Sequence, residues 1–104
     1  MADTAATVTP REALERVKGY LESYELTVLL ADGFEDAFIG LMYRFTNAPV
    51  AAYDRAKCIQ ILMERDGMGE DEAEEFFEFN VIGAYVGELT PCFISRFDGE
   101  DYPV

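Results

Sequence analysis

The sequence predicts a small α+β domain, an antiparallel sheet of three to four strands with about three helices packed on one face. Apolar residues recur at helical spacing in three segments, and short runs rich in β-branched and aromatic residues lie between and after them. With 104 residues, half of them hydrophobic, the chain is long enough for one domain with a real core. We expect a flexible leader at residues 1–8, the domain at residues 9–97 and an acidic tail at residues 98–104.

The first helix is expected to begin after Thr9. Thr9 is a favoured N-cap residue, Pro10 suits the first helical position, and Glu12 completes a capping box. The apolar positions that follow at helical spacing are Leu14, Val17, Leu21 and Tyr24. The next run, LTVLLADG at residues 26–33, is either a short strand or the end of this helix.

Strand-like composition returns in the middle of the chain and near its end. The runs AFIGLMYRF and VAAYD flank the connection TNAP, which predicts a β-hairpin. Pro49 fits the start of the second strand, where a missing N–H does least harm. A last strand is expected in CFISRF, after Pro91.

Two further helices are predicted between these strands. Asp54 is a good N-cap for residues 55–66, and Gly67 supplies a left-handed stop. The next helix begins about three residues later with acids in its first turn, where the helix dipole favours anions. Its core side is expected to consist of Ala73, Phe76, Phe77, Val81 and Ala84. The whole run FFEFNVIGAYVGELTP is therefore interpreted as buried framework.

The charge balance is extreme, with 21 acids against eight bases and a net charge of −13. Such a field repels nucleic acid and anionic membrane and steers basic protein surfaces toward the molecule. No cluster of Lys and Arg exists for direct DNA or RNA binding, and no stretch approaches the roughly 20 apolar residues of a membrane span. Cys58 and Cys92 are interpreted as buried free thiols of a cytoplasmic protein.

The sequence does not match the catalytic and metal-binding patterns that its acidic residues suggest. The chain has no His, which removes the commonest general base and most zinc sites. A calcium loop that started at Asp66 would need a ligand, a Gly and a Glu where this chain has Met68, Asp71 and Phe77. Glu75 and Glu78 lie one turn apart, as two magnesium ligands would, but the second acidic pair is missing. We therefore predict a protein that is not an enzyme, with no catalytic residue, metal or cofactor.

An acidic cluster remains. Residues 64–78 hold eight acids and one base, more negative charge than helix capping and solubility require. The plain interpretation is a solvated helix face. The sharper one is a surface that mimics phosphates, because duplex DNA carries about one charge per 1.7 Å. The predicted partner-binding residues are Asp66, Glu70, Asp71, Glu72, Glu74, Glu75 and Glu78.

Several segments carry a family resemblance. DGFEDAFIG at residues 32–40, ILMERDG, and EFFEFNVIGAYVGELTPCFI at residues 75–94 resemble a family of small acidic proteins of phages, prophages and bacteria, mostly uncharacterised. Small acidic proteins in that setting often inhibit host defence, as anti-CRISPR and anti-restriction proteins do. The resemblance therefore implies an accessory, anti-defence role, but it brings no catalytic residues with it.

Three functions follow as hypotheses. The first is an inhibitor that docks its acidic surface on a basic, nucleic-acid-binding surface of a host defence nuclease or CRISPR effector. Phe79 and Tyr85, if exposed, would add an aromatic anchor beside the acids. The second is a small-ligand or nucleotide-sequestering module, and the third a carboxylate-metal hydrolase. Assembly into a homo-oligomer stays open.

Overall fold

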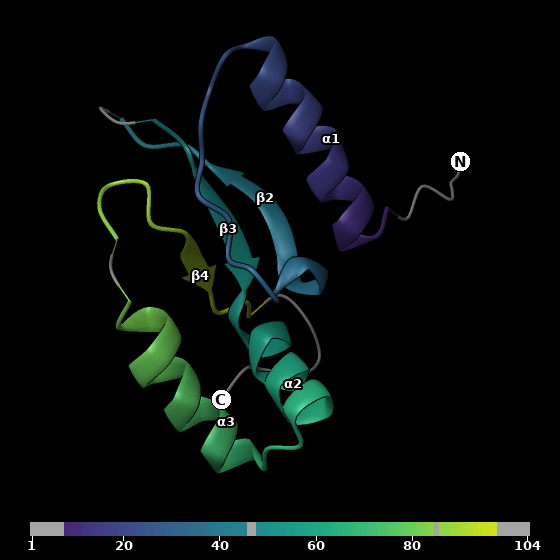
Figure 1. Ribbon diagram of the computed structural model, residues 1–104, viewed down its shortest axis with the longest axis vertical. Coiled ribbons are helices and arrows are strands. Elements are labelled where there is room, and N and C mark those ends of the chain that lie inside the picture. The colour runs from purple at the N-terminus through teal and green to yellow at the C-terminus, as the bar shows by residue number, and fades with distance from the viewer. Residues whose placement is uncertain (1–7, 46–47, 85, 98–104) are drawn as a thin grey trace.

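The structure, a computed structural model, describes residues 8–45, 48–84 and 86–97. It confirms the α+β class with a small sheet. The elements in chain order are α1 (Pro10–Ser23), the 3-10 helix η1 (Glu35–Ala37), β2 (Phe38–Met42), β3 (Val50–Asp54), α2 (Arg55–Asp66), α3 (Glu70–Phe77), the π-helix η2 (Glu78–Ile82) and β4 (Cys92–Ile94) (Figure 1). The expected tail and nearly all of the expected leader lie outside the described residues.

The sheet has three strands in the order β2-β3-β4. β2 and β3 form the expected antiparallel hairpin, with Leu41 opposite Ala51. The prediction of a wholly antiparallel sheet is wrong, because β4 runs parallel to β3 and pairs Phe93 with Tyr53. The reason is the long connection between them. The α2–α3 hairpin leaves the end of β3 and returns, and the loop before β4 carries the chain back toward the start of β3 (Figure 1).

The run at residues 26–33 forms neither of the two structures expected for it. α1 ends at Ser23, and residues 26–31 belong to no helix or strand. The helix ends because Glu25 takes a left-handed backbone conformation with φ of 55°, and the Leu26 N–H then bonds to the Leu21 carbonyl at 2.8 Å. The chain continues as a coil that runs alongside the sheet down to η1 (Figure 1).

The helix caps agree with the sequence. Thr9 Oγ1 accepts from the Glu12 N–H at 3.1 Å, and Glu12 Oε1 accepts from the Thr9 N–H at 2.9 Å. Asp54 Oδ1 accepts from the Lys57 N–H at 3.2 Å at the start of α2, and Gly67 ends that helix with φ of 71°. These caps satisfy backbone groups that helix ends otherwise leave unpaired.

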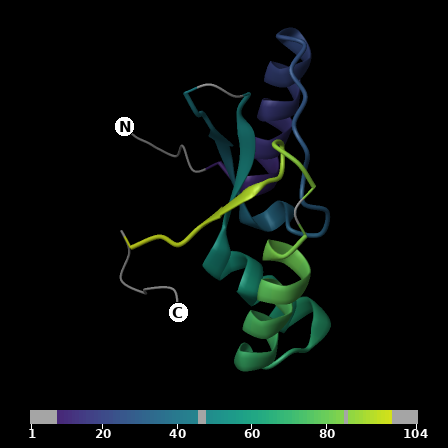
Figure 2. The same cartoon turned by 90° about the vertical axis from the view of Figure 1, so that its left-hand side faces the viewer.

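All three helices reach one core on the Tyr53 side of the sheet. Leu14 of α1, Leu62 of α2 and Phe77 of α3 are buried there with Tyr53. Figure 2 shows α1 on one side of the sheet, with the α2–α3 hairpin extending beyond the end of β3. The core is held by non-local packing around one central tyrosine.

We call the aromatic centre of this core the aromatic core, and it consists of Phe38, Tyr53, Phe77 and Phe93. Tyr53 contacts Phe38 edge-on at 5.5 Å between ring centroids and stacks on Phe93 at 5.7 Å. Phe77 meets Phe93 edge-on at 5.1 Å. Edge-on and offset rings are favourable geometries beyond simple burial. The aromatic core therefore joins β2, β3, β4 and α3, elements far apart in the sequence.

Candidate functional site

Most of the seven predicted contact residues lie on one short helix. Five stand on α3, Glu78 begins η2, and Asp66 ends α2. Glu74 is half-buried and the others are exposed. Gly69 caps α3 without a side-chain hydrogen bond, so the acids of the first turn face the positive end of the helix dipole directly. The structure thus places five of the seven predicted residues on α3 and the other two on the elements before and after it.

Two of the seven carboxylates are neutralised within the chain. Arg65 binds both oxygens of Asp66, with Nε at 3.0 Å from Oδ1 and Nη2 at 2.9 Å from Oδ2. These hydrogen bonds hold the pKa of Asp66 below its usual range. Arg55 Nη2 lies 3.1 Å from Glu78 Oε2. Asp66 and Glu78 are therefore less available to a partner than the prediction assumed.

The other five carboxylates make no ion pair or side-chain hydrogen bond within the described chain. We call this set the acidic face, and it consists of Glu70, Asp71, Glu72, Glu74 and Glu75. Neighbouring like charges on a helix destabilise it by a few tenths of a kcal/mol per pair. A basic partner would relieve this repulsion, so the acidic face is suited to binding one.

Exposed aromatic rings stand beside the acidic face. Phe79 is 75% exposed, and Phe76 is 38% exposed. The exposed Phe79 meets the condition set for an aromatic anchor beside the acids, whereas Tyr85 lies outside the described residues. Aromatic anchors are common at the centre of protein interfaces. The acidic face can thus attract a basic partner electrostatically, and the ring of Phe79 can make an apolar contact with it.

The expectation that the run from Phe76 to Pro91 is buried framework is wrong for much of it. Phe77 is fully buried, but Val81 is only half-buried and Ala84 is exposed. The cause is the π-helical turn of η2, in which the Gly83 N–H bonds back to the Glu78 carbonyl at 3.1 Å. One extra residue per turn rotates later side chains away from the helical register that the 3.6-residue spacing assumed.

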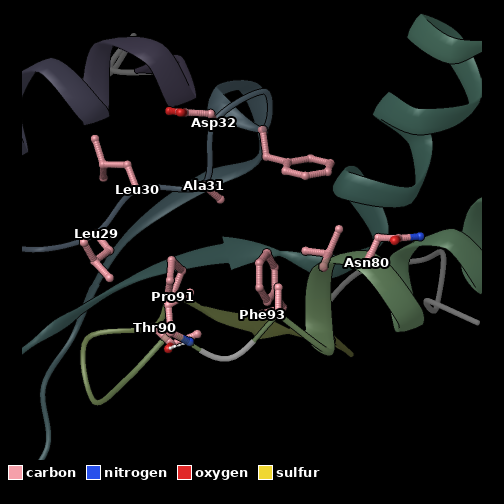
Figure 3. Close-up of a pocket in the computed structure, with 12 residues that line it drawn as sticks. Leu29, Leu30, Ala31, Asp32, Asn80, Thr90, Pro91 and Phe93 are labelled. Carbon is pink, nitrogen blue, oxygen red and sulfur yellow. Dashed lines mark hydrogen bonds between the residues drawn. The ribbon is translucent and has the colours of Figure 1, made fainter.

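Apolar side chains are exposed both in and after η2 and in the coil at residues 26–31. We call these residues the apolar margin, and it consists of Leu29, Leu30, Phe79, Ile82 and Val86. Their exposed fractions lie between 37% and 75%. Part of the apolar margin borders a pocket of about 490 Å³ between residues 29–34 and the segments of η2 and β4 (Figure 3). The sequence reasoning missed this pocket, because it forms between segments about 50 residues apart.

The pocket does not suit a nucleotide. Its twelve lining residues are mostly apolar and include Asp32 but no Lys or Arg. A nucleotide phosphate would need cationic or N–H donors that converge on it. The pocket therefore favours an apolar group over an anion.

A second aromatic cluster lies at the C-terminal end of α1. The rings of Tyr20 and Tyr24 lie 4.9 Å apart, and the hydroxyls of Tyr20 and Tyr43 are 2.9 Å apart. The hydrogen bond to Tyr43 raises the pKa of Tyr20. All three side chains are exposed. The spacing of Tyr20 and Tyr24, the C-cap of α1, signals their contact, but the approach of Tyr43, just after β2, could not be read from the sequence.

The two thiols are held in their protonated form by burial. Burial raises the pKa of Cys58 to about 12, so this thiol stays protonated at neutral pH. Cys92 is half-buried, with Sγ 3.6 Å from Met42 Sδ, and burial raises its pKa too. Among residues 8–45, 48–84 and 86–97, no three Cys, Asp or Glu side chains gather in a way that could hold a metal ion.

Comparisons with protein-family models, with curated proteins and with solved structures found no match to this chain. No helix in the described part of the chain is long and apolar enough to cross a membrane. The function of the candidate site is therefore inferred from its geometry and charge.

Proposed function

We propose that this protein is a non-enzymatic binding domain that docks its acidic face on a basic, nucleic-acid-binding surface of another protein. The observation that carries the proposal is the set of five carboxylates on one helix that have no basic partner among the described residues, beside the 75% exposed ring of Phe79. The net charge of −13 steers such an encounter over a longer range.

The charge spacing resembles that of a nucleic-acid backbone in part. α3 has eight residues and is about 12 Å long at 1.5 Å per residue. Its five carboxylates thus give about one charge per 2.4 Å of helix axis, against about one per 1.7 Å for duplex DNA. The partner that fits this spacing is a groove lined by Lys and Arg that normally holds a phosphate backbone.

The target class follows from charge and resemblance together. The motifs at residues 32–40 and 75–94 resemble small acidic proteins of phages and prophages. We therefore propose a host defence nuclease or CRISPR effector as the partner, with inhibition by occupation of its nucleic-acid groove. The two alternatives receive less support, because the pocket lacks a cationic group for a nucleotide and no carboxylate cluster of the described chain could hold a metal.

The test is competition with DNA. The purified protein is immobilised, bacterial lysate is passed over it, and duplex DNA or salt is used to elute what binds. We expect nucleic-acid-binding proteins to be retained and to be displaced by DNA and by about 0.5 M salt, because exposed charges are strongly screened there. Retained proteins that neither DNA nor salt displaces would contradict the proposal.

A pair of variants with equal charge change locates the contact. The triple variant Asp71→Asn, Glu72→Gln, Glu75→Gln removes three charges from the acidic face. The control variant Glu15→Gln, Glu22→Gln, Glu25→Gln removes three charges on and just after α1. We expect the first to weaken partner binding at least tenfold and the second by less than about threefold. Equal losses would mean that net charge, and not the acidic face, is responsible.

A further inference from the structure

We propose that residues 27–30 and the pocket beside them bind an extended peptide segment of a partner by strand addition. In this complex an apolar peptide side chain fills the pocket, and basic peptide residues flank it. The site is separate from the acidic face, so the inference does not rest on the proposed function.

The first observation is an unpaired stretch of backbone. Residues 27–30 belong to no helix or strand, and no hydrogen bond within the described chain uses their N–H or C=O groups. Both ends are nevertheless anchored. The Leu26 N–H bonds to the Leu21 carbonyl at 2.8 Å, and the Ala31 N–H donates to Tyr53 Oη at 2.8 Å. A held segment with unpaired backbone groups is a template for an added strand.

The second observation is the pocket itself. Leu29 and Leu30 line one side of it, and Pro91 and Phe93 lie across from them (Figure 3). Its volume of about 490 Å³ lies in the range typical of ligand sites. The hydroxyl of Thr90 is already used, since it accepts from the Val86 N–H at 2.9 Å and donates to the Gly87 carbonyl. The walls therefore recognise an apolar group.

The unpaired backbone and the adjoining pocket together favour an extended peptide as the ligand. In an extended chain, alternate side chains point to the same side, so backbone pairing along residues 27–30 would present an apolar side chain to the adjoining pocket. Main-chain hydrogen bonds would supply affinity, and the pocket would supply specificity. A small apolar molecule would use the pocket but leave the unpaired backbone unused.

The negative charge of the protein indicates which peptide residues should flank the apolar side chain. The lining of the pocket contains Asp32 and no Lys or Arg, and the whole chain carries −13. Basic residues on either side of the apolar side chain complement this field. A second copy of the chain is disfavoured as the occupant, because it brings the same large negative charge.

Binding of designed peptides tests the inference on the unaltered protein. The probe is a fluorescein-labelled peptide of sequence Lys-Lys-Val-Phe-Val-Lys-Lys, followed by fluorescence anisotropy. We expect saturable binding with a Kd of about 100 μM or tighter, and at least tenfold weaker binding when the central Phe is replaced by Ala. No saturable binding up to about 1 mM, or no effect of the Phe replacement, overturns the proposal.

N-methylated peptides separate strand addition from simple apolar binding. Two probes carry methyl groups on alternate backbone amides, one on the odd positions and the other on the even positions. Because only alternate amides of an added strand face the protein, one probe should lose binding at least tenfold and the other should keep most of it. Equal binding of both probes means that no strand is added, and the proposal is then wrong.

A variant that fills the pocket tests whether the probe binds there. Ala84 lines the pocket and is exposed, so Ala84→Trp should fill it and abolish probe binding; the control is Ala56→Trp, at an exposed position of α2. We also expect slower amide hydrogen exchange at residues 28–30 when the probe is bound. Equal probe binding by both variants overturns the proposal, as does self-association of the unaltered protein that Ala84→Trp abolishes. If Ala84→Trp fails to fold, the N-methylated probes still decide.

Discussion

Two apolar regions of this molecule lie next to each other, and one is buried whereas the other is exposed. In the aromatic core, Tyr53 and Phe77 are 1% and 0% exposed. In the apolar margin, Phe79 is 75% exposed although it is only two residues from Phe77. Hydrophobic composition is similar in the two regions, so composition does not decide burial. What decides it is whether the backbone presents the side chain to a complementary surface. Side chains two residues apart on a helix point to nearly opposite sides, so Phe77 faces the core and Phe79 faces away from it.

The difference teaches how to interpret an exposed apolar residue here. The aromatic core holds the fold together, because its rings join β2, β3, β4 and α3. The apolar margin contributes little burial, and large exposed apolar patches commonly mark interaction sites. The comparison predicts that core substitutions change stability, whereas margin substitutions change binding.

The largest effect is expected for Phe77→Ala. The substitution should lower the free energy of unfolding by about 3–5 kcal/mol, because it removes a fully buried ring and leaves a cavity against Phe93. Phe79→Ala is the matched control and should change stability by less than about 0.5 kcal/mol. Urea denaturation followed by circular dichroism measures both. Similar values for the two variants would remove the distinction between core and margin.

The second-largest effect is expected at alkaline pH, which should lower the free energy of unfolding. Cys58 has a native pKa of about 12 against an ordinary value of 9.0, so between these values the unfolded chain loses the thiol proton and the native state keeps it. Stability is therefore complete below about pH 9 and falls as pH rises, by at most about 4 kcal/mol near pH 12. Burial also raises the pKa of Tyr53, which adds a loss in the same direction above about pH 10.

Urea unfolding at about pH 8 and pH 10.5 measures this loss, with Cys58→Ala as the control. The variant should be less stable at pH 8, because it leaves a small cavity, but its stability should depend less on pH. A variant with the same pH dependence as the unaltered protein would show that Cys58 is not the group that titrates.

A smaller effect is expected for the tyrosine hydroxyl in the core. Tyr53→Phe removes the acceptor of the Ala31 N–H and should lower the free energy of unfolding by about 1–2 kcal/mol. Tyr43→Phe removes an exposed hydrogen bond to Tyr20 and should change it by less than about 0.5 kcal/mol. Thermal denaturation compares the two. If both variants melt together, the anchor between Tyr53 and the coil at residues 26–31 is not important for stability.

The smallest effect is expected in the apolar margin. Val86→Ser should leave the free energy of unfolding within about 0.5 kcal/mol, because the side chain is already 62% exposed. The same variant should weaken the designed peptide probe, since Val86 lines the pocket. A loss of more than about 1.5 kcal/mol would instead place Val86 in the structural core.

Local signals in the sequence predicted the helices well, and the helix ends show why. The capping box of Thr9 and Glu12, the N-cap Asp54 and the left-handed Gly67 act through neighbours three or four residues away. Such contacts form wherever the local sequence allows, so they can be read without knowing the fold. The hairpin of β2 and β3 was predictable because two strand-like runs stand close in the sequence with a turn-forming connection between them.

The direction of β4 and the fate of residues 26–33 were not predictable in this way. β4 pairs with β3 across about 40 residues, so its direction depends on how the α2–α3 hairpin returns the chain. Residues 26–33 have strand-like composition, but the left-handed Glu25 and the anchor of Ala31 on Tyr53 hold them as a coil. Long-range contacts overrode local propensity in both cases.

The sequence by itself determined the α+β class, the helix starts and the −13 charge, and it placed all seven predicted contact acids on or next to one helix. Only the tertiary structure decided that Arg55 pairs with Glu78, which lies 23 residues away, whereas Arg65 and Asp66 are neighbours in the sequence. It also decided that Phe77 is core, that Phe79 is surface, and that a pocket opens beside residues 27–30. Charge and capping are local properties, whereas burial depends on what the rest of the chain brings to the same place.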